Sequence, residues 1–223
     1  MLRRHLVLAT VAAVLLFAVW QMHFRWSPDM RLWKAFGGAS IGMLWFAVLI
    51  GPAARLWRPL IRLVPWRRES GIWFAVISAV HGYLVWDGWA RWDVPALLGY
   101  QLSPETGAYL RAEPGFGLAN VLGLMALTLG LALAATSFDR AVSFLGISAW
   151  KWLHTLAYAI FYLTAAHVLY FAFMHYTPAA PQAQTYEPNP LRWVYLAMVV
   201  TASVAQAAAF VKTTWVRRSF GGA

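Results

Sequence analysis

Residues 150–175, WKWLHTLAYAIFYLTAAHVLYFAFMH, decide the fold that the sequence predicts. The stretch is almost uncharged and longer than the roughly 20 apolar residues that cross the hydrocarbon of a bilayer. Backbone amides in lipid must pair within their own segment, so the stretch is expected to be a helix. It contains His154 and His167. Ionisable side chains inside a membrane are costly and usually mark ion, proton or cofactor sites.

Five more apolar segments extend this pattern along the chain. Together they predict six membrane-spanning helices, at residues 5–24, 35–50, 71–89, 118–136, 150–175 and 191–211. The second segment is the shortest and the richest in glycine. The first follows Arg3 and Arg4 as a signal peptide would, but its apolar run is long and no small-residue cleavage site ends it, so we expect a retained helix. The predicted fold is an all-α integral membrane bundle, a single domain over residues 1–223.

The composition excludes several classes of protein. Of the 223 residues, 61% are hydrophobic and only 12% are charged, about half the charge of an ordinary soluble domain. The absence of cysteine rules out disulfides, thiolate ligands and iron–sulfur clusters built on this chain. The net charge of +10 reports topology in a membrane protein, so we expect the lipid bilayer as a partner and no nucleic acid.

Lys and Arg are unevenly distributed over the predicted loops. With the N-terminus inside, 12 of the 18 lie on the inner side, many of them in or beside the short basic loop 52–70. The outer side has the long loop 87–117 and a Pro/Gln/Ala-rich loop, 176–190. Basic residues concentrate in cytoplasmic loops. We therefore expect both termini in the cytoplasm of a bacterial-type inner membrane.

A third histidine, His81, lies inside the segment 71–89. It precedes the outer end of its segment by eight residues, as His167 precedes the outer end of 150–175. The two helices run in the same direction in the predicted topology, so both histidines are about 12 Å from the outer ends. Two imidazoles at one depth can bind a haem iron from opposite sides. His81 and His167 are therefore the predicted axial ligands of a b-type haem. The alternative for each is a purely structural role, in which the histidine forms a hydrogen bond to a neighbouring helix.

His154 has no second histidine at the same predicted depth on the segment 71–89. It lies 13 residues before His167, which is about 20 Å along an ideal helix and roughly 140° around it. Thirteen residues before His81 the chain has Arg68. An inner haem on His154 would need another ligand: His5, as a weak candidate, water, or an open position.

Basic residues are the candidates for binding haem propionates or a flavin phosphate. These are Arg67, Arg68, Lys151 and Arg91. The two remaining histidines, His23 and His175, lie near the predicted outer surface and are expected to be interfacial.

Three segments of the chain resemble those of a known family. PWRRESGIWFAVISAVHGYL (65–84) is similar to the third helix of ferric reductase-like transmembrane proteins, in which an arginine pair and a glycine open the helix that carries a haem histidine. ALAATSFDRAVSFLGISAWKWLHTLAYAIFYLTAAHVLYF (132–171) resembles the end of their fourth helix and their fifth, and GPAARLW (51–57) fits after the second. The resemblance covers roughly residues 40–175, and its specificity comes from the order and spacing of these motifs.

The resemblance implies b-type haem, one or two per chain, in a six-helix bundle that passes electrons from the cytoplasm outward. By position, His81 and His167 match the outer pair, and His154 matches the inner ligand on the fifth helix. NADPH oxidases of this family have a second histidine where this chain has Arg68, and they carry a flavin- and NAD(P)H-binding domain that these residues do not include. Both departures resemble the MsrQ/YedZ type of haem subunit.

The sequence therefore predicts an electron-transfer protein, a component of an oxidoreductase rather than a complete enzyme. A separate cytoplasmic flavin reductase (with FMN) or a quinol is the expected donor, and a periplasmic protein, ferric iron or oxygen the acceptor. One alternative is a haem-free transporter or assembly factor that uses the histidines for protons or metal, although no Asp or Glu lies well inside the spans. Another, a dihaem cytochrome b, needs two complete histidine pairs.

Overall fold

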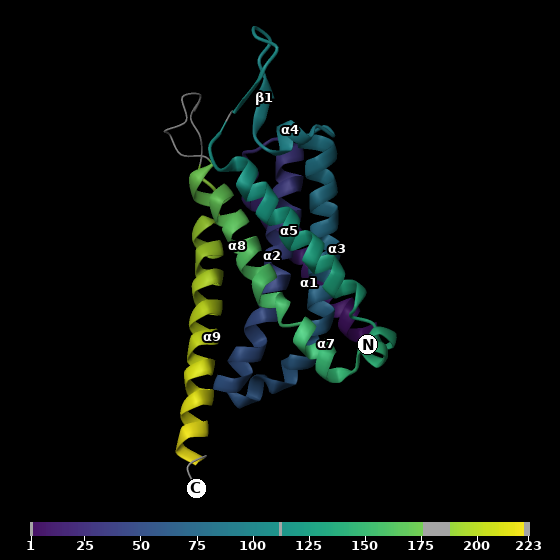
Figure 1. The fold of residues 1–223 in the computed structure, drawn as a ribbon, viewed down its shortest axis with the longest axis vertical. Coiled ribbons are helices and arrows are strands. Elements are labelled where there is room, and N and C mark those ends of the chain that lie inside the picture. Colours follow the sequence, from purple (N-terminus) through teal and green to yellow (C-terminus); the bar gives the residue numbers. More distant parts are fainter. Residues whose placement is uncertain (1, 112, 176–187, 221–223) are drawn as a thin grey trace.

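Long helices make up most of the part of the chain that the computed structural model describes, residues 2–111, 113–175 and 188–220. Within those residues, five segments are helical, long and apolar enough to cross a membrane. They are α1 (Leu2–Met22), α2 (Pro28–Leu56), α5 (Phe116–Ala135), the segment Ile147–Met174, and α9 (Arg192–Phe220), whose apolar part is Arg192–Trp215. Figure 1 shows them packed along one long axis.

α2 is the central helix, and the expectation that the second span is short, over 35–50, was wrong. Its 29 residues begin at Pro28 and continue past Pro52 to Leu56, and the hydroxyl of the N-cap residue Ser27 accepts a hydrogen bond from the Met30 amide. α2 packs against α1, α3, α8 and α9. Its small residues, among them Gly38 and Ala39, let neighbouring helices approach closely, as in other membrane helix bundles.

The predicted third span is helical but is not among the five apolar segments. α3 (Arg67–Leu84) continues into a π-helical turn, η2 (Val85–Trp89). Its 18 residues open with two arginines and Glu69, and this charge keeps it outside the group of candidate spans. α3 nevertheless packs against both α2 and α5, at one side of the bundle (Figure 1). The sixth crossing stays a prediction.

The helix expected over 150–175 is broken near its start. α6 (Asp139–Leu145) and α7 (Ile147–Leu153) precede a turn at His154 and Thr155, after which α8 (Leu156–Leu169) continues into a second π-helical turn, η3 (Tyr170–Met174). The Thr155 hydroxyl donates to the Trp152 carbonyl at 2.6 Å, a local bond that competes with the helical ladder. The ideal-helix separation of His154 from His167 therefore does not apply.

The two ends of the bundle differ. One, the hairpin end, holds α4 (Val94–Leu97) and an antiparallel pair of strands, β1 (Tyr100–Leu102) and β2 (Tyr109–Arg111), with Gln101 opposite Leu110. The all-α prediction overlooked this hairpin because its strands have only three residues each. The other, the η1 end, holds the 3₁₀ segment η1 (Arg58–Trp66), which replaces the loop expected at 52–70.

The first turn of α1 and the last turn of α9 both lie toward the η1 end (Figure 1). Termini on one side are what an even number of crossings produces, and their cytoplasmic location stays a prediction. The loop predicted at 176–190 lies outside the described residues except for its last three.

Candidate functional site

A cavity of about 460 Å³ lies in the half of the bundle nearer the hairpin end. It is bordered by α2, α3, α5, α8 and the first turns of α9, and its walls are mainly apolar and aromatic, including Trp33, Phe74, Trp86, Phe116, Leu127 and Phe171. Small-molecule and cofactor sites have this character and typically occupy about 300–1,000 Å³.

His81 and His167 meet at this cavity. His81 comes from α3 and His167 from α8, and both side chains form part of the cavity wall. Their ring centres are 6.5 Å apart, and the ring planes are inclined by 76°. The two histidines that the sequence places at one depth are therefore brought together from helices that are separated in the sequence by α5. Each helix passes into a π-helical turn a few residues later, a feature often found at functional sites.

Backbone hydrogen bonds orient both imidazoles. His81 Nδ1 donates to the Trp33 carbonyl at 3.0 Å, and His167 Nδ1 donates to the Ala119 carbonyl at 2.7 Å. A carbonyl only accepts, so each Nδ1 bears the proton, and the lone pair of a neutral ring is then on Nε2. Neither Nε2 has a hydrogen-bond partner among the described residues. Metal-binding histidines are commonly held in this way, with the second nitrogen bonded to a carbonyl or carboxylate.

The pair fits a metal ion that brings its own further ligands. Two imidazoles that share one metal ion, each at about 2 Å, have ring centres about 6 Å apart, close to the 6.5 Å observed. Within the described residues, no group of three or more His, Cys, Asp or Glu side chains could hold a bare ion. Haem supplies four nitrogen ligands and leaves two axial positions, so the two histidines and the apolar walls fit haem b.

Two glycines make room for the histidine rings. An ideal Cβ at Gly37 on α2 would lie 3.2 Å from His81 Cε1, and one at Gly123 on α5 would lie 2.7 Å from His167 Nδ1. Residue spacing alone does not indicate this role for Gly123. Its proximity to His167 depends on how α5 packs against α8.

Lys34 is the basic side chain of the described cavity wall. It follows Trp33 on α2, and its ammonium lies 4.2 Å from the centre of the Trp26 ring. The predicted second span, 35–50, begins one residue after Lys34 and therefore does not include it. The signal that could have found it is the Ser27–Pro28 helix start, which puts Lys34 one turn before Gly37.

The other predicted site residues lie elsewhere. His154 is at the η1 end, where its Nε2 is 3.3 Å from the Thr136 hydroxyl and its ring centre is 4.1 Å from that of Trp150, with the ring planes inclined by 31°. His5 is on α1 and does not border the cavity. No second histidine is placed with His154 by the described contacts.

None of the four basic residues proposed for propionates or a flavin phosphate borders the cavity. Arg67 donates to the Ala47 carbonyl at 2.8 Å, and Arg68 donates to the Ser137 carbonyl and pairs with Asp139 at 2.6 Å. The charges of both act on His154, so they remain candidates for an anionic group at the η1 end. Lys151 and Arg91 are exposed.

Fold and site together define a class: a helical protein with five candidate membrane spans and a two-histidine cavity near one end. No protein-family model matches this chain, and no curated protein matches it in sequence.

Proposed function

We propose that this protein is a b-type haem protein that transfers electrons across a membrane, similar in role to ferric reductase-like haem subunits. One observation carries the proposal: two imidazoles, each fixed through Nδ1 to a backbone carbonyl, border one apolar cavity with their ring centres 6.5 Å apart. A structural histidine pair would need no cavity, and a bare-metal site would need more ligands.

In this proposal His81 and His167 would hold the haem iron. The Trp33 and Ala119 carbonyls hold the two rings in their orientation. The aromatic walls exclude water and, with the ligands, set the redox potential. When bound, haem supplies one-electron chemistry, and the protein contributes binding, orientation and electrostatics. Lys34 borders the cavity near His81 and is the side chain we assign to a propionate carboxylate.

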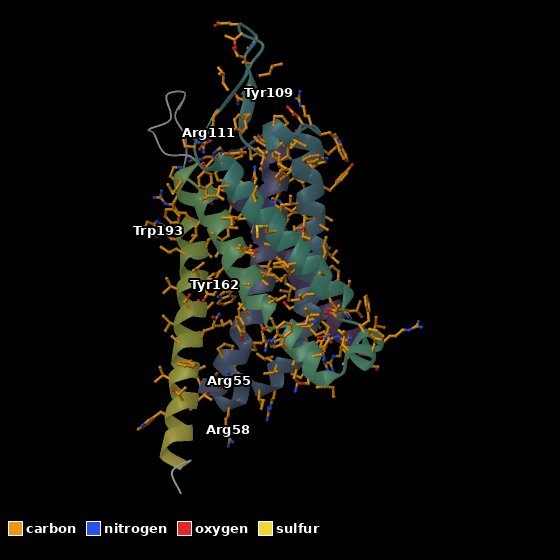
Figure 2. The ribbon with its side chains drawn as sticks, in the orientation of Figure 1. Arg55, Arg58, Tyr109, Arg111, Tyr162 and Trp193 are labelled. Carbon is orange, nitrogen blue, oxygen red and sulfur yellow. The ribbon has the colours of Figure 1, made fainter. Side chains whose placement is uncertain are left out.

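The donor in this proposal acts at the η1 end, where Figure 2 labels Arg55 and Arg58. A basic face suits a flavin phosphate or an acidic reductase surface. His154 and the neighbouring Trp150 lie at the same end, so a second haem or a quinone there is part of the proposal. The acceptor is on the hairpin side. Its identity, protein, ferric iron or oxygen, decides whether the chain is a relay or a terminal reductase.

The experiment is a reduced-minus-oxidised visible spectrum of the detergent-purified protein from haem-replete cells, with haem counted per chain. We expect a b-type spectrum that is lost in His81→Ala and His167→Ala and kept in the control His5→Ala. Imidazole added to His167→Gly should restore it, which separates ligand loss from misfolding. A further drop in the haem count in His154→Ala would identify a second site. Wild-type protein with no Soret band after haem addition would overturn the proposal and favour a haem-free transporter or assembly factor.

A further inference from the structure

An acid–base pair closes the cavity toward the hairpin end. His175 Nδ1 lies 2.5 Å from Glu113 Oε2. His175 directly follows η3, and Glu113 lies in the segment before α5, so this contact links the two segments. The side chains are 20% and 25% exposed, so the pair is in reach of water. His175 also borders the cavity. The pair therefore lies between the cavity and the surface.

Other polar and charged groups surround this pair. The Tyr170 hydroxyl lies 2.9 Å from the Pro114 carbonyl and 3.3 Å from Glu113 Oε1, and it donates toward both. Lys34 acts on His175 from α2, and Arg111 acts on Tyr170 from β2; Figure 2 labels Arg111 at the hairpin end. Glu113 is the acidic side chain bonded to His175.

Aromatic rings connect the pair to the proposed haem ligand. The Phe171 ring is 4.9 Å from the ring of His167 and 5.2 Å from the ring of His175, centre to centre. Phe116 touches both Phe171 and His175, at 5.3 and 5.1 Å. A charge placed at His167 therefore acts on His175 across apolar rings, where water screens it little.

We propose that the Glu113–His175 pair is a proton-binding site coupled to the redox state of the His81–His167 cavity. Each electron that enters the cavity from the flavin or quinol donor is matched by one proton from water at the hairpin end. The Glu113–His175 pair takes up this proton, and the contact between His175 Nδ1 and Glu113 Oε2 stabilises the protonated pair. The proton leaves when the electron passes to the acceptor. This inference rests on the proposed function.

The electrostatics of the unreduced site agree with this sequence of events. Burial, and then the charge of Lys34, lower the pKa of His175 to about 4, and burial raises the pKa of Glu113. His175 is thus neutral near pH 7, and its Nδ1–H donates to the Glu113 carboxylate. One added negative charge in the cavity raises the pKa of His175. Coupling is therefore expected in a window that begins near pH 4 and extends upward.

The test is a potentiometric titration of the haem-loaded protein between about pH 4 and 8, in wild type, His175→Gln, Glu113→Gln and the control Glu105→Gln in the hairpin turn. In wild type and the control, the midpoint potential should fall as pH rises above 4. The limit is tenfold in the equilibrium constant per pH unit, about 59 mV for one electron. In His175→Gln the potential should be independent of pH, and in Glu113→Gln the window should move to lower pH.

A redox-difference infrared spectrum provides a second readout that a merely structural pair would not produce. Imidazole and carboxylate bands should change on reduction in wild type, and the carboxylate band should be absent in Glu113→Gln. A wild-type slope that persists in His175→Gln, or a haem-loaded wild type with no slope at all, would overturn the coupling alone. A protein that binds no haem would overturn the proposed function and the coupling with it.

Discussion

Gly123 on α5 packs so closely against the His167 ring on α8 that a methyl group on residue 123 would clash with the ring. A Cβ at position 123 would lie 2.7 Å from His167 Nδ1 and 2.9 Å from Cε1. Because Nδ1 is also bonded to the Ala119 carbonyl one turn earlier on α5, the ring cannot retreat without losing that bond.

Gly123→Ala should therefore displace the His167 ring. Overpacking of this kind typically costs about 1–3 kcal/mol, and we expect lower haem retention and a shifted Soret band. Haem content and the spectrum after purification measure the effect. Gly71→Ala is the matched control, because a Cβ there meets nothing within 4 Å. Equal haem content in the two variants would show that His167 does not depend on this contact.

Lys34→Met should lower the midpoint potential of the bound haem. A positive charge beside the cavity stabilises the site that has gained an electron, so its removal favours the oxidised state by tens of millivolts. Arg91→Gln at the same end is the control, since Arg91 is exposed and water and salt screen its charge. A redox titration near pH 7 compares them. An unchanged potential in Lys34→Met would place the lysine charge away from the haem.

The ligand-free protein should lose stability as the pH falls from about 6.5 to 4, in part through His175. Burial lowers the pKa of the folded His175 to about 4, whereas in the unfolded chain it is about 6.5. Below pH 6.5 the unfolded state therefore binds a proton that the folded state does not, and stability falls by at most about 1.4 kcal/mol per pH unit.

Thermal unfolding in detergent at several pH values measures this loss. His175→Gln should have a smaller drop in Tm between pH 6.5 and 4 than wild type, and His5→Gln the same drop as wild type. If His175→Gln keeps the full drop, the titrating group is another one. His23 would then be the first to examine, because it is 1% exposed and burial also lowers its pKa.

The predicted topology can be tested with single cysteines, since the chain has none of its own. Glu105→Cys in the hairpin turn should react with an impermeant maleimide added to intact cells. Arg62→Cys in η1 should react only after the membrane is opened. The reverse pattern would invert the orientation. Reaction of both positions from outside would show that the hairpin and η1 ends face the same side, contrary to the six-span topology.

Much of the fold follows from local composition. Apolar runs of spanning length led to the helices that the structure has at α1, α5 and α9, because helix formation in lipid depends on the segment itself. The expectation of a short second span over 35–50 was wrong because α2 includes Lys34 and continues past Pro52, and a buried central helix tolerates both. The break at His154 was missed because one threonine side chain, bonded to a nearby carbonyl, interrupts an otherwise continuous apolar pattern.

The candidate site, too, could be predicted from the sequence only in part. The equal spacing of His81 and His167 from their helix ends was readable from the sequence alone, since depth in a helix follows from residue count. Only the tertiary structure decided which carbonyls hold their Nδ1 atoms, that Gly37 and Gly123 face the rings, and that Lys34 and the Glu113–His175 pair adjoin the same cavity. These contacts join residues tens of positions apart, and they depend on how helices rotate and pack against one another, which no local pattern encodes.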